Sequence, residues 1–396
     1  MAERRILIVG AGLGAMRLAR QLRQRGHKGP ITVLGAEHHL PYDRPPLSKQ
    51  VLRGESDSTA FADAASLDVR WVTGTRAVSL DAARAKVIAS DGQTYSYDTL
   101  VLAPGGSPRP LPGLDPGHGI HVLRTIDDAL ALRRDIRPGG RLVVIGGGFI
   151  GCEIAASARK VGAEVDLIEA LAAPLLRVLG PRAAARVTAL HQSNGVRLHL
   201  GATLAEVLRN AEGRLRGIRL GDGAVIEADA VVVGIGIVPE IDWLTDSGIA
   251  LQDGIVCDSS GHTNIPGVFA LGDAAQWWHD LADTHRRIEH WTTTVDQAQV
   301  VAANIVAAPG EAPACLAAAP YFWSDQYDQK IQGMGFIDPT DHVDEISIRD
   351  RAVLLYSRNG ILRGVVGFSI PMAVMRTKPL IERGATVEEA LALLMP

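Results

Sequence analysis

The segment RLVVIGGGFIGCEIAASARKVGAEVDLIEA, residues 141–170, decides the fold. Its apolar start predicts a buried strand, and three glycines follow in the pattern GxGxxG, at Gly146, Gly148 and Gly151. A helix and a second apolar strand, at residues 165–168, complete the segment. This order is typical of a mononucleotide-binding unit, because the glycines let the backbone and the helix N-terminus approach a pyrophosphate.

The residues after the second strand bear on which nucleotide binds. Glu169 stands directly after the strand, where a carboxylate accepts hydrogen bonds from a ribose and repels a 2′-phosphate. Ala170 follows it, where a phosphate-binding site would favour arginine. NADH is therefore favoured over NADPH, although the nearby Arg177 leaves NADPH open. Ile150 in the turn and Gly236 complete the expected NAD site.

The same unit opens the chain, which indicates an internal repeat. Strands are expected at Ile6–Val9 and Ile31–Leu34, with a helix between them that ends at Arg25. The first turn has an alanine at the third position of the glycine pattern, which is a tolerated variant. Its residues are Gly10, Gly12, Gly14 and Ala15. Glu37 is the first carboxylate after the second strand and is the candidate for the ribose.

The last part of the chain has a different pattern. Two apolar runs, at residues 353–357 and 361–367, flank Asn359-Gly360, which is a strong signal for a two-residue hairpin turn. A helix is expected at Val387–Leu394. The sequence therefore predicts an α/β protein with two Rossmann-like dinucleotide-binding domains and a C-terminal α+β domain.

Composition excludes several classes of function. The 396 residues are 47% hydrophobic and 21% charged, and the formal net charge is −4. Neither nucleic acid nor a membrane is expected as a partner, because the chain has no basic excess and no apolar run long enough to span a bilayer. A cytoplasmic protein is the default. Cys152, Cys257 and Cys315 lie far apart, without the spacing of a zinc site, a disulfide framework or a redox-active dithiol.

Six motifs together carry a resemblance that spans nearly the whole chain. They are LPYDRPPLSK at residues 40–49, GGGFIGCE at 146–153, RVLG at 177–180, GVFALGD at 267–273, RIEHW at 287–291 and PYFWSDQYDQKIQ at 320–332. The sequence resembles the oxygenase-coupled ferredoxin reductases, which are two-Rossmann flavoproteins. The resemblance implies that the first unit binds FAD. It implies an FAD-binding domain at residues 1–108 and 237–318, an NAD-binding domain at 109–236 and a C-terminal domain at 319–396.

The resemblance also implies roles for single residues. Lys49 would lie beside flavin N5 in an ion pair with Glu153, whereas without the resemblance Lys49 is interpreted as a solvated helix residue. Arg44 would contact the FAD diphosphate or ribose, and the alternative is a surface arginine. Asp273 ends a strand and would hold a ribitol hydroxyl, although a helix cap for residues 274–278 is the alternative.

Two tryptophans and a proline complete the expected flavin site. Trp291 and Trp323 fall in motifs whose segments lie beside the isoalloxazine in the family, and the ordinary interpretation of each is a core tryptophan. Trp291 is the stronger candidate and joins Lys49 and Glu153 as a catalytic residue. Pro104 stands where the family has the threonine of Ala-Thr-Gly, so this loop lacks one backbone amide that could contact the flavin.

The missing cysteines bear on how electrons leave the flavin. Glutathione-reductase-like enzymes use a dithiol after the first unit, but the corresponding PYDRPPLSK contains no cysteine. Electrons must therefore leave the flavin directly. The resemblance implies an NADH:ferredoxin reductase, whose [2Fe–2S] ferredoxin serves a monooxygenase or a ring-hydroxylating dioxygenase. Alternatives are rubredoxin, a quinone, monodehydroascorbate or oxygen as acceptor, or a non-enzymatic role like that of apoptosis-inducing factor. Monomer and homodimer are both open.

Overall fold

The computed structural model describes residues 4–395. The chain divides into two compact units, each built from three stretches of sequence. Unit 1 contains the N-terminal stretch up to Asp43, Ala60–Ser107 and Val238–Phe322. Unit 2 contains Arg44–Thr59, Pro108–Ile237 and the C-terminal stretch from Trp323. Each unit is described by itself.

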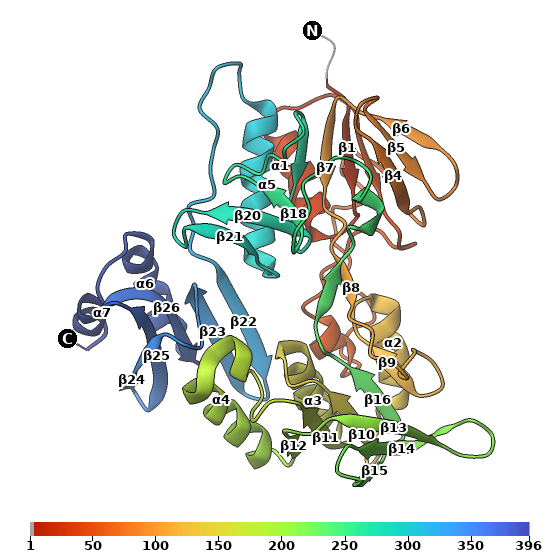
Figure 1. Ribbon diagram of the computed structural model, residues 1–396, viewed down its shortest axis with the longest axis vertical. Helices are drawn as coiled ribbons and strands as arrows, with labels where there is room; N and C mark the ends of the chain where they lie inside the picture. The colour runs from red at the N-terminus through yellow and green to blue at the C-terminus, as the bar shows by residue number, and fades with distance from the viewer. Residues whose placement is uncertain (1–3, 396) are drawn as a thin grey trace. The chain divides into compact units, whose positions relative to one another are not determined.

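A five-stranded parallel sheet forms the core of unit 1 (Figure 1). Its central strand, β1, is buried along its whole length, as expected for a parallel strand covered on both faces. Helices α1 (Leu13–Gln24) and α5 (Trp291–Val306) pack against each other. The strand order is β19 (Val268–Ala270), β7 (Thr99–Leu102), β1 (Ile6–Val9), β2 (Ile31–Leu34) and β3 (Arg70–Val72).

Two small three-stranded sheets and a short helix complete unit 1. One sheet is antiparallel and consists of β4 (Ala77–Asp81), β5 (Lys86–Ala89) and β6 (Thr94–Ser96). The other consists of β18 (Ile255–Cys257), β20 (Ala275–His279) and β21 (Thr284–Arg287). A 3-10 helix, η2, spans Asp242–Leu244. The short strands β8 (Gly106–Pro108) and β17 (Ile237–Pro239) pair with each other, and the residues of each strand are divided between the two units.

Unit 2 repeats the architecture of unit 1. The central strand of its parallel sheet, β10 (Arg141–Ile145), pairs with β11 (Glu164–Glu169) and β16 (Ala230–Val233), as β1 pairs with β2 and β7 in unit 1. The order is β9 (Ile120–Val122), β16 (Ala230–Val233), β10 (Arg141–Ile145), β11 (Glu164–Glu169) and β12 (Arg197–Leu200). The helices are α2 (Ile126–Asp135), α3 (Phe149–Val161) and α4 (Leu176–Ser193), and an antiparallel sheet contains β13 (Leu204–Arg209), β14 (Leu215–Leu220) and β15 (Val225–Glu227). The internal repeat predicted from the glycine turns is therefore confirmed at the level of sheet topology.

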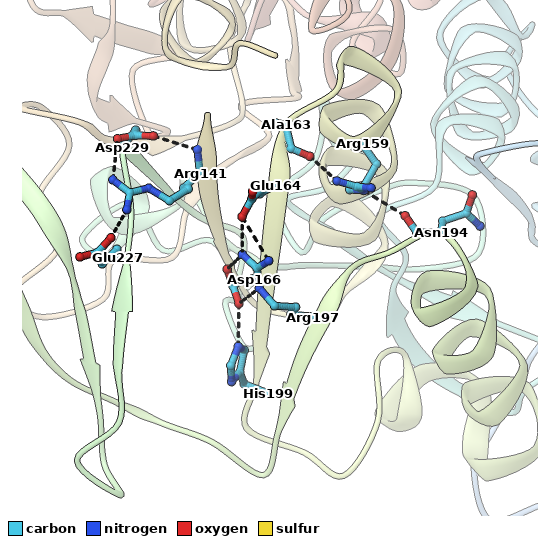
Figure 2. A network of polar contacts seen from close by, with 10 residues as sticks. All are labelled: Arg141, Arg159, Ala163, Glu164, Asp166, Asn194, Arg197, His199, Glu227 and Asp229. Atoms are coloured by element: carbon cyan, nitrogen blue, oxygen red, sulfur yellow. Dashed lines mark hydrogen bonds and ion pairs between the residues drawn. The ribbon is translucent and has the colours of Figure 1, made fainter. Parts of the chain in front are cut away.

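A charged network holds neighbouring strands of this sheet together (Figure 2). Asp166 on β11 is buried, and it accepts hydrogen bonds from Arg197 Nη2 at 2.7 Å and His199 Nε2 at 2.8 Å, both on β12. Burial opposes the charge of Asp166, but the hydrogen bonds from Arg197 and His199 hold its pKa below the ordinary value. Arg141 on β10 pairs with Asp229, which directly precedes β16 and is only partly buried. The contacts of Asp166 compensate a buried charge inside the sheet.

The C-terminal part of unit 2 is an antiparallel sheet with two helices packed on it. Asn359 and Gly360 have φ values of 52° and 78°, so both adopt the left-handed conformation of the two-residue turn that the sequence predicts. Helix α6 (Pro371–Glu382) packs on β23 and β26, and α7 (Val387–Leu394) packs on β25 and β26. The strand order is β22 (Tyr321–Gln326), β23 (Gln329–Gly335), β26 (Ile361–Phe368), β25 (Arg351–Arg358) and β24 (His342–Ile348).

The two parallel sheets with their helices and the C-terminal α+β region confirm the predicted fold class. One alternative that the sequence left open was wrong. Residues 274–278 do not form a helix, because Ala275–His279 is strand β20, whose alternate side chains are buried. Among the helices of residues 4–395, none combines the length and the apolar character that crossing a bilayer requires.

Candidate active site

The first glycine turn packs so closely that side chains do not fit at two of its positions. Gly10 has a φ of 105°, and a Cβ there would lie 1.9 Å from the carbonyl oxygen of Ala103. At Gly14 a Cβ would lie 2.4 Å from the Leu271 side chain. Gly12 forms the start of α1, where a Cβ would meet nothing within 4 Å. The turn therefore joins the ends of β1, β7 and β19 and leaves space in front of the α1 N-terminus.

The second turn has the same geometry. Gly146 also has a φ of 105°, and a Cβ there would lie 2.4 Å from the carbonyl oxygen of Gly234. At Gly151 a Cβ would lie 2.0 Å from the carbonyl oxygen of Gly146, so the helix can approach the strand only with glycine at this position. The first turn has Ala15 there, fully buried. Ile150 is 46% exposed in the first turn of α3.

Neither α1 nor α3 begins with a side-chain cap or an acidic residue. Helix α2 differs, because Thr125 and Asp128 form a capping box at its start. The amides of the first turns of α1 and α3, together with the positive end of each helix dipole, are therefore suited to an anion such as a pyrophosphate. The structure thus fits a dinucleotide at both turns.

Glu169 lies against the second turn. Its Oε2 accepts a hydrogen bond from Gly147 N at 2.6 Å, and its Oε1 accepts one from Leu171 N at 2.8 Å. Each oxygen keeps further acceptor capacity, so the carboxylate is held in place and can still bind ribose hydroxyls. Arg177 is exposed near the start of α4, and Gly236 has a φ of 98°.

In unit 1 the strand register places Gly35 at the position that Glu169 has in unit 2. Glu37 stands two residues further along the chain and is partly buried. Its Oε2 accepts a hydrogen bond at 2.5 Å from the hydroxyl of Tyr42, a residue of the PYDRPPLSK motif. The loop after β7 packs on the first turn, since Pro104 Cα would lie 3.0 Å from a Cβ at Gly10. Pro104 is partly exposed in that loop.

The Gly272-Asp273 turn and the start of α5 converge on the first glycine turn. Thr294 on α5 lies 3.5 Å from the Cβ position of Gly14 and 3.7 Å from that of Gly272. Gly272 N donates to Gln297 Oε1 at 2.8 Å, which fixes the turn that carries Asp273. Because strand β20 follows this turn, the interpretation of Asp273 as a helix cap is wrong.

Two buried polar atoms at the start of α5 support a polar ligand in unit 1. His290 Nδ1 and Thr293 Oγ1 are buried without a hydrogen-bond partner among residues 4–395. Burial lowers the pKa of His290 to about 4 against the opposing effect of Asp273, so the ring is neutral. Buried polar atoms in native proteins are nearly always hydrogen-bonded, and a bound cofactor would supply partners here.

Trp291 is the first residue of α5 and is only partly buried, so the core interpretation is wrong. Its Nε1 donates to Asp43 Oδ1 at 2.8 Å, and the Arg17 guanidinium lies 5.0 Å from its ring centroid. These contacts fix the orientation of the indole. Trp323 is also only partly buried, on the side of β22 opposite to the buried Ser324. Sequence reasoning missed Arg17 and Asp43.

Lys49 and Glu153 form a buried ion pair within unit 2. Lys49 lies in a π-helical turn, Leu47–Val51, that follows two prolines; such turns are rare and frequent at functional sites. Its Nζ lies 2.5 Å from Glu153 Oε2 and 3.0 Å from the carbonyl oxygen of Pro45. Lys49 is 6% exposed and Glu153 4% exposed, so the interpretation of Lys49 as a solvated residue is wrong.

Two serines that sequence reasoning missed complete the surroundings of Glu153. Ser48 Oγ donates to Oε2 at 2.5 Å, and Ser324 Oγ donates to Oε1 at 2.8 Å. Ser48 lies in the LPYDRPPLSK motif and Ser324 in the PYFWSDQYDQKIQ motif, so the family resemblance was the one sequence signal that could have pointed to them. Arg44 donates from Nη1 to the carbonyl oxygen of Arg124 at 2.5 Å and is partly buried, which disfavours a merely solvated arginine.

The comparisons with known proteins agree with this geometry. A family model described as pyridine nucleotide-disulphide oxidoreductase matches residues 4–298, and one described as reductase C-terminal matches residues 321–393. The chain is 38% identical to the ferredoxin–NAD(+) reductase component of an anthranilate 1,2-dioxygenase system from Burkholderia cepacia, over 83% of this chain and 81% of the relative. It is 36% identical to a rubredoxin–NAD(+) reductase from Pseudomonas putida, over 85% of this chain and 88% of the relative. A crystal structure of a covalent putidaredoxin reductase–putidaredoxin complex matches with a TM-score of 0.93 and 31% identity, over 100% of this chain and 99% of that chain.

Two glycine turns on parallel sheets, followed by a C-terminal antiparallel sheet, define a flavin- and nicotinamide-dependent reductase of the pyridine nucleotide-disulphide oxidoreductase class. Within that class, the chain belongs to the family of oxygenase-coupled ferredoxin reductases, which confirms the resemblance seen in the motifs. The chain is therefore a flavoprotein oxidoreductase that uses a nicotinamide nucleotide.

Proposed function

We propose that the chain is an FAD-dependent NADH:ferredoxin reductase that passes single electrons to a [2Fe–2S] ferredoxin, which feeds a monooxygenase or a ring-hydroxylating dioxygenase. One observation carries the proposal. The segment that follows the first mononucleotide-binding unit in the sequence is where disulphide reductases would carry a dithiol. In this chain it carries Lys49, which forms a buried ion pair with Glu153. Cys152 and Cys257 offer no substitute, because both are buried and burial raises the pKa of both. The third cysteine, Cys315, is exposed but stands far from this segment in the sequence.

The residues at each glycine turn support the assignment of the cofactors. For FAD, we assign the pyrophosphate to the α1 N-terminus, the ribose to Glu37 and the ribitol to Asp273. Further contacts are assigned to Arg44, Pro104, Trp291 and Trp323. In unit 2 the α3 N-terminus would hold the NADH pyrophosphate and Glu169 the ribose, with Ile150 and Gly236 nearby. We assign FAD to residues 1–108 and 237–318, NAD to 109–236 and a separate C-terminal domain to 319–396.

Bound FAD would accept a hydride from NADH and release the electrons one at a time. Within the chain, Glu153 compensates the ammonium of Lys49, which can then remain charged despite burial. We assign to Lys49 the task of placing positive charge where negative charge develops on reduction. Trp291, fixed by Asp43 and Arg17, would present an aromatic surface that excludes water.

Anaerobic titration with NADH and NADPH, followed by mixing with [2Fe–2S] ferredoxins, tests the proposed activity. Reduction of cytochrome c by NADH should require added ferredoxin. Rapid turnover with a quinone or oxygen alone would exclude this function. Lys49→Gln, which keeps a hydrogen-bond donor but removes the charge, should slow flavin reduction while FAD stays bound.

Rubredoxin is the second candidate acceptor, because a rubredoxin–NAD(+) reductase is a relative of similar identity. Steady-state assays with each acceptor at equal concentration separate the two candidates. A kcat/KM higher for rubredoxin than for every ferredoxin tested would favour it. The cytoplasmic location expected from the sequence is part of the same proposal, and sedimentation analysis distinguishes monomer from homodimer.

A further inference from the structure

A chain of buried hydrogen bonds runs from Glu153 to Tyr327 inside unit 2. Ser324 Oγ donates to Glu153 Oε1 at 2.8 Å, and Gln326 Nε2 donates to Ser324 Oγ at 3.1 Å. His191 Nε2 lies 3.1 Å from Gln326 Oε1, and its Nδ1 lies 2.8 Å from the hydroxyl oxygen of Tyr327. Ser324, Gln326 and His191 are 0% exposed, so water does not compete for these groups.

The carboxylate at one end dictates the direction of every bond in the chain. An ionised Glu153 only accepts, so Ser324 must donate its single proton to it and accept from the amide nitrogen of Gln326. The amide oxygen of Gln326 then faces His191, whose Nε2 must carry the proton. The other ring nitrogen, Nδ1, is left to accept from Tyr327.

The electrostatic environment agrees with this assignment of protons. Burial lowers the pKa of His191 to about 4, so its ring is neutral and has one donor and one acceptor. Burial also raises the pKa of Tyr327, so its hydroxyl keeps the proton that it donates. All donors therefore point towards Glu153, and aligned bonds of this kind strengthen one another.

Three segments that are distant in sequence build the chain. Helix α4 provides His191, strand β22 provides Ser324 and Gln326 on the same face, and the turn after β22 provides Tyr327. Tyr327 has a φ of 57°, a left-handed conformation that is unfavourable for a bulky residue. Such conformations persist where the surrounding structure holds them, often at functional positions. Here the conformation accompanies the contact with His191.

We propose that Ser324, Gln326 and His191 are positioning residues that hold the Glu153 carboxylate turned towards Lys49. Glu153 Oε2 is shared by Lys49 and Ser48, whereas within residues 4–395 the hydrogen bond to Oε1 comes from Ser324 alone. The side of the carboxylate that faces away from Lys49 is therefore controlled by the C-terminal strand β22. This inference rests on the proposed role of the Lys49–Glu153 pair in flavin reduction.

The test compares variants of the holoenzyme by stopped-flow reduction with NADH. Ser324→Ala should slow flavin reduction at saturating NADH by about tenfold, the effect of losing one hydrogen bond to a charged group, with little change in NADH affinity. His191→Leu should also slow it, and His191→Gln, which keeps a donor near the position of Nε2, should recover most of the loss. Ser193→Ala, at an exposed site on α4, is the matched control and should behave as the wild type.

A spectroscopic readout separates positioning from a general loss of stability. Imidazole nitrogen shifts in holoenzyme with isotope-labelled histidine should show His191 neutral, with the proton on Nε2, from neutral pH down to about pH 5. A proton on Nδ1, or a charged ring in that range, would overturn the inference. If His191→Leu does not fold, Ser324→Ala and Tyr327→Phe decide the outcome through the same two readouts.

The result with Lys49→Gln distinguishes failure of this inference from failure of the proposed role of the pair. If Lys49→Gln slows flavin reduction and Ser324→Ala and His191→Leu do not, the inference is wrong and the role of the pair stands. If Lys49→Gln has no effect either, the role of the pair in flavin reduction is wrong and the inference fails with it.

Discussion

Lys49 Nζ and Glu153 Oε2 lie 2.5 Å apart, with side chains that are 8% and 4% exposed. Two charges buried to this degree have lost most of their hydration, so each depends on the other and on its hydrogen bonds. Replacing such a pair by apolar residues costs little, whereas removing one partner leaves an uncompensated charge. The pair is therefore better explained by function than by its contribution to stability.

Removing the cation alone should destabilise the fold strongly. We expect Lys49→Met to lower the free energy of unfolding by about 3–5 kcal/mol, because Glu153 is then buried without a counter-charge. The double variant Lys49→Met/Glu153→Leu should recover most of that loss, although it should reduce flavin slowly. Urea unfolding of the three proteins measures the effect. A double variant as unstable as the single one would contradict this explanation.

The two glycine turns should differ in their tolerance of a methyl group. At Gly151 a Cβ would lie 2.0 Å from the carbonyl oxygen of Gly146, so Gly151→Ala must displace α3 from the turn. We expect a loss of about 1–3 kcal/mol in stability and a weaker affinity for NADH, measured by unfolding and by titration. Ala15→Gly, at the matching position of unit 1, should cost only about 1 kcal/mol through helix propensity, with FAD retained. Unchanged NADH affinity in Gly151→Ala would show that the turn does not bind the nucleotide.

Features encoded by neighbouring residues were predictable from the sequence. The strands β1 and β2, both glycine turns and the Asn359-Gly360 hairpin depend on short-range patterns of apolar residues and glycine, and the structure has them at the expected positions. The alternative of a helix at residues 274–278 was excluded by the structure, in which Ala275–His279 is a strand with alternating burial.

The surroundings of Glu153 could not be derived in the same way. His191, Ser324 and Gln326 come from distant parts of the chain, and no periodicity connects them. A lysine in a polar segment is usually solvated, so the burial of Lys49 follows from its partner and not from its neighbours. The family motifs supplied the pair, whereas the hydrogen-bond chain behind it became visible only in three dimensions.

Glu169 should decide the choice between the two nicotinamide nucleotides. One of its oxygens is held by the Gly147 amide of the second turn and the other by the Leu171 amide, which fixes its negative charge. At the ribose position that we propose, this charge would repel a 2′-phosphate. Glu169→Arg should shift the ratio of kcat/KM values towards NADPH by about tenfold or more, since it replaces a repulsive charge by an attractive one. Glu169→Gln is the matched control and should shift the ratio less, because it removes the charge without reversing it. An unchanged ratio in Glu169→Arg would exclude the ribose role.

Acid should destabilise the protein through His191. Burial lowers its pKa to about 4, whereas a histidine in an unfolded chain titrates near about 6.5. Since the unfolded chain binds the proton first, the stability that the neutral ring contributes is complete above the unfolded value and is lost as the pH falls towards 4. The difference between the two values corresponds to about 3 kcal/mol.

His191→Gln keeps a polar side chain that does not titrate, so its free energy of unfolding should fall less between neutral pH and about pH 4.5. His279 and His290, whose pKa values burial also lowers to about 4, contribute equally to both proteins, so the difference isolates His191. His342→Gln, at an exposed site on β24, should keep the pH dependence of the wild type, and equal slopes for wild type and His191→Gln would show that His191 is not buried in its neutral form.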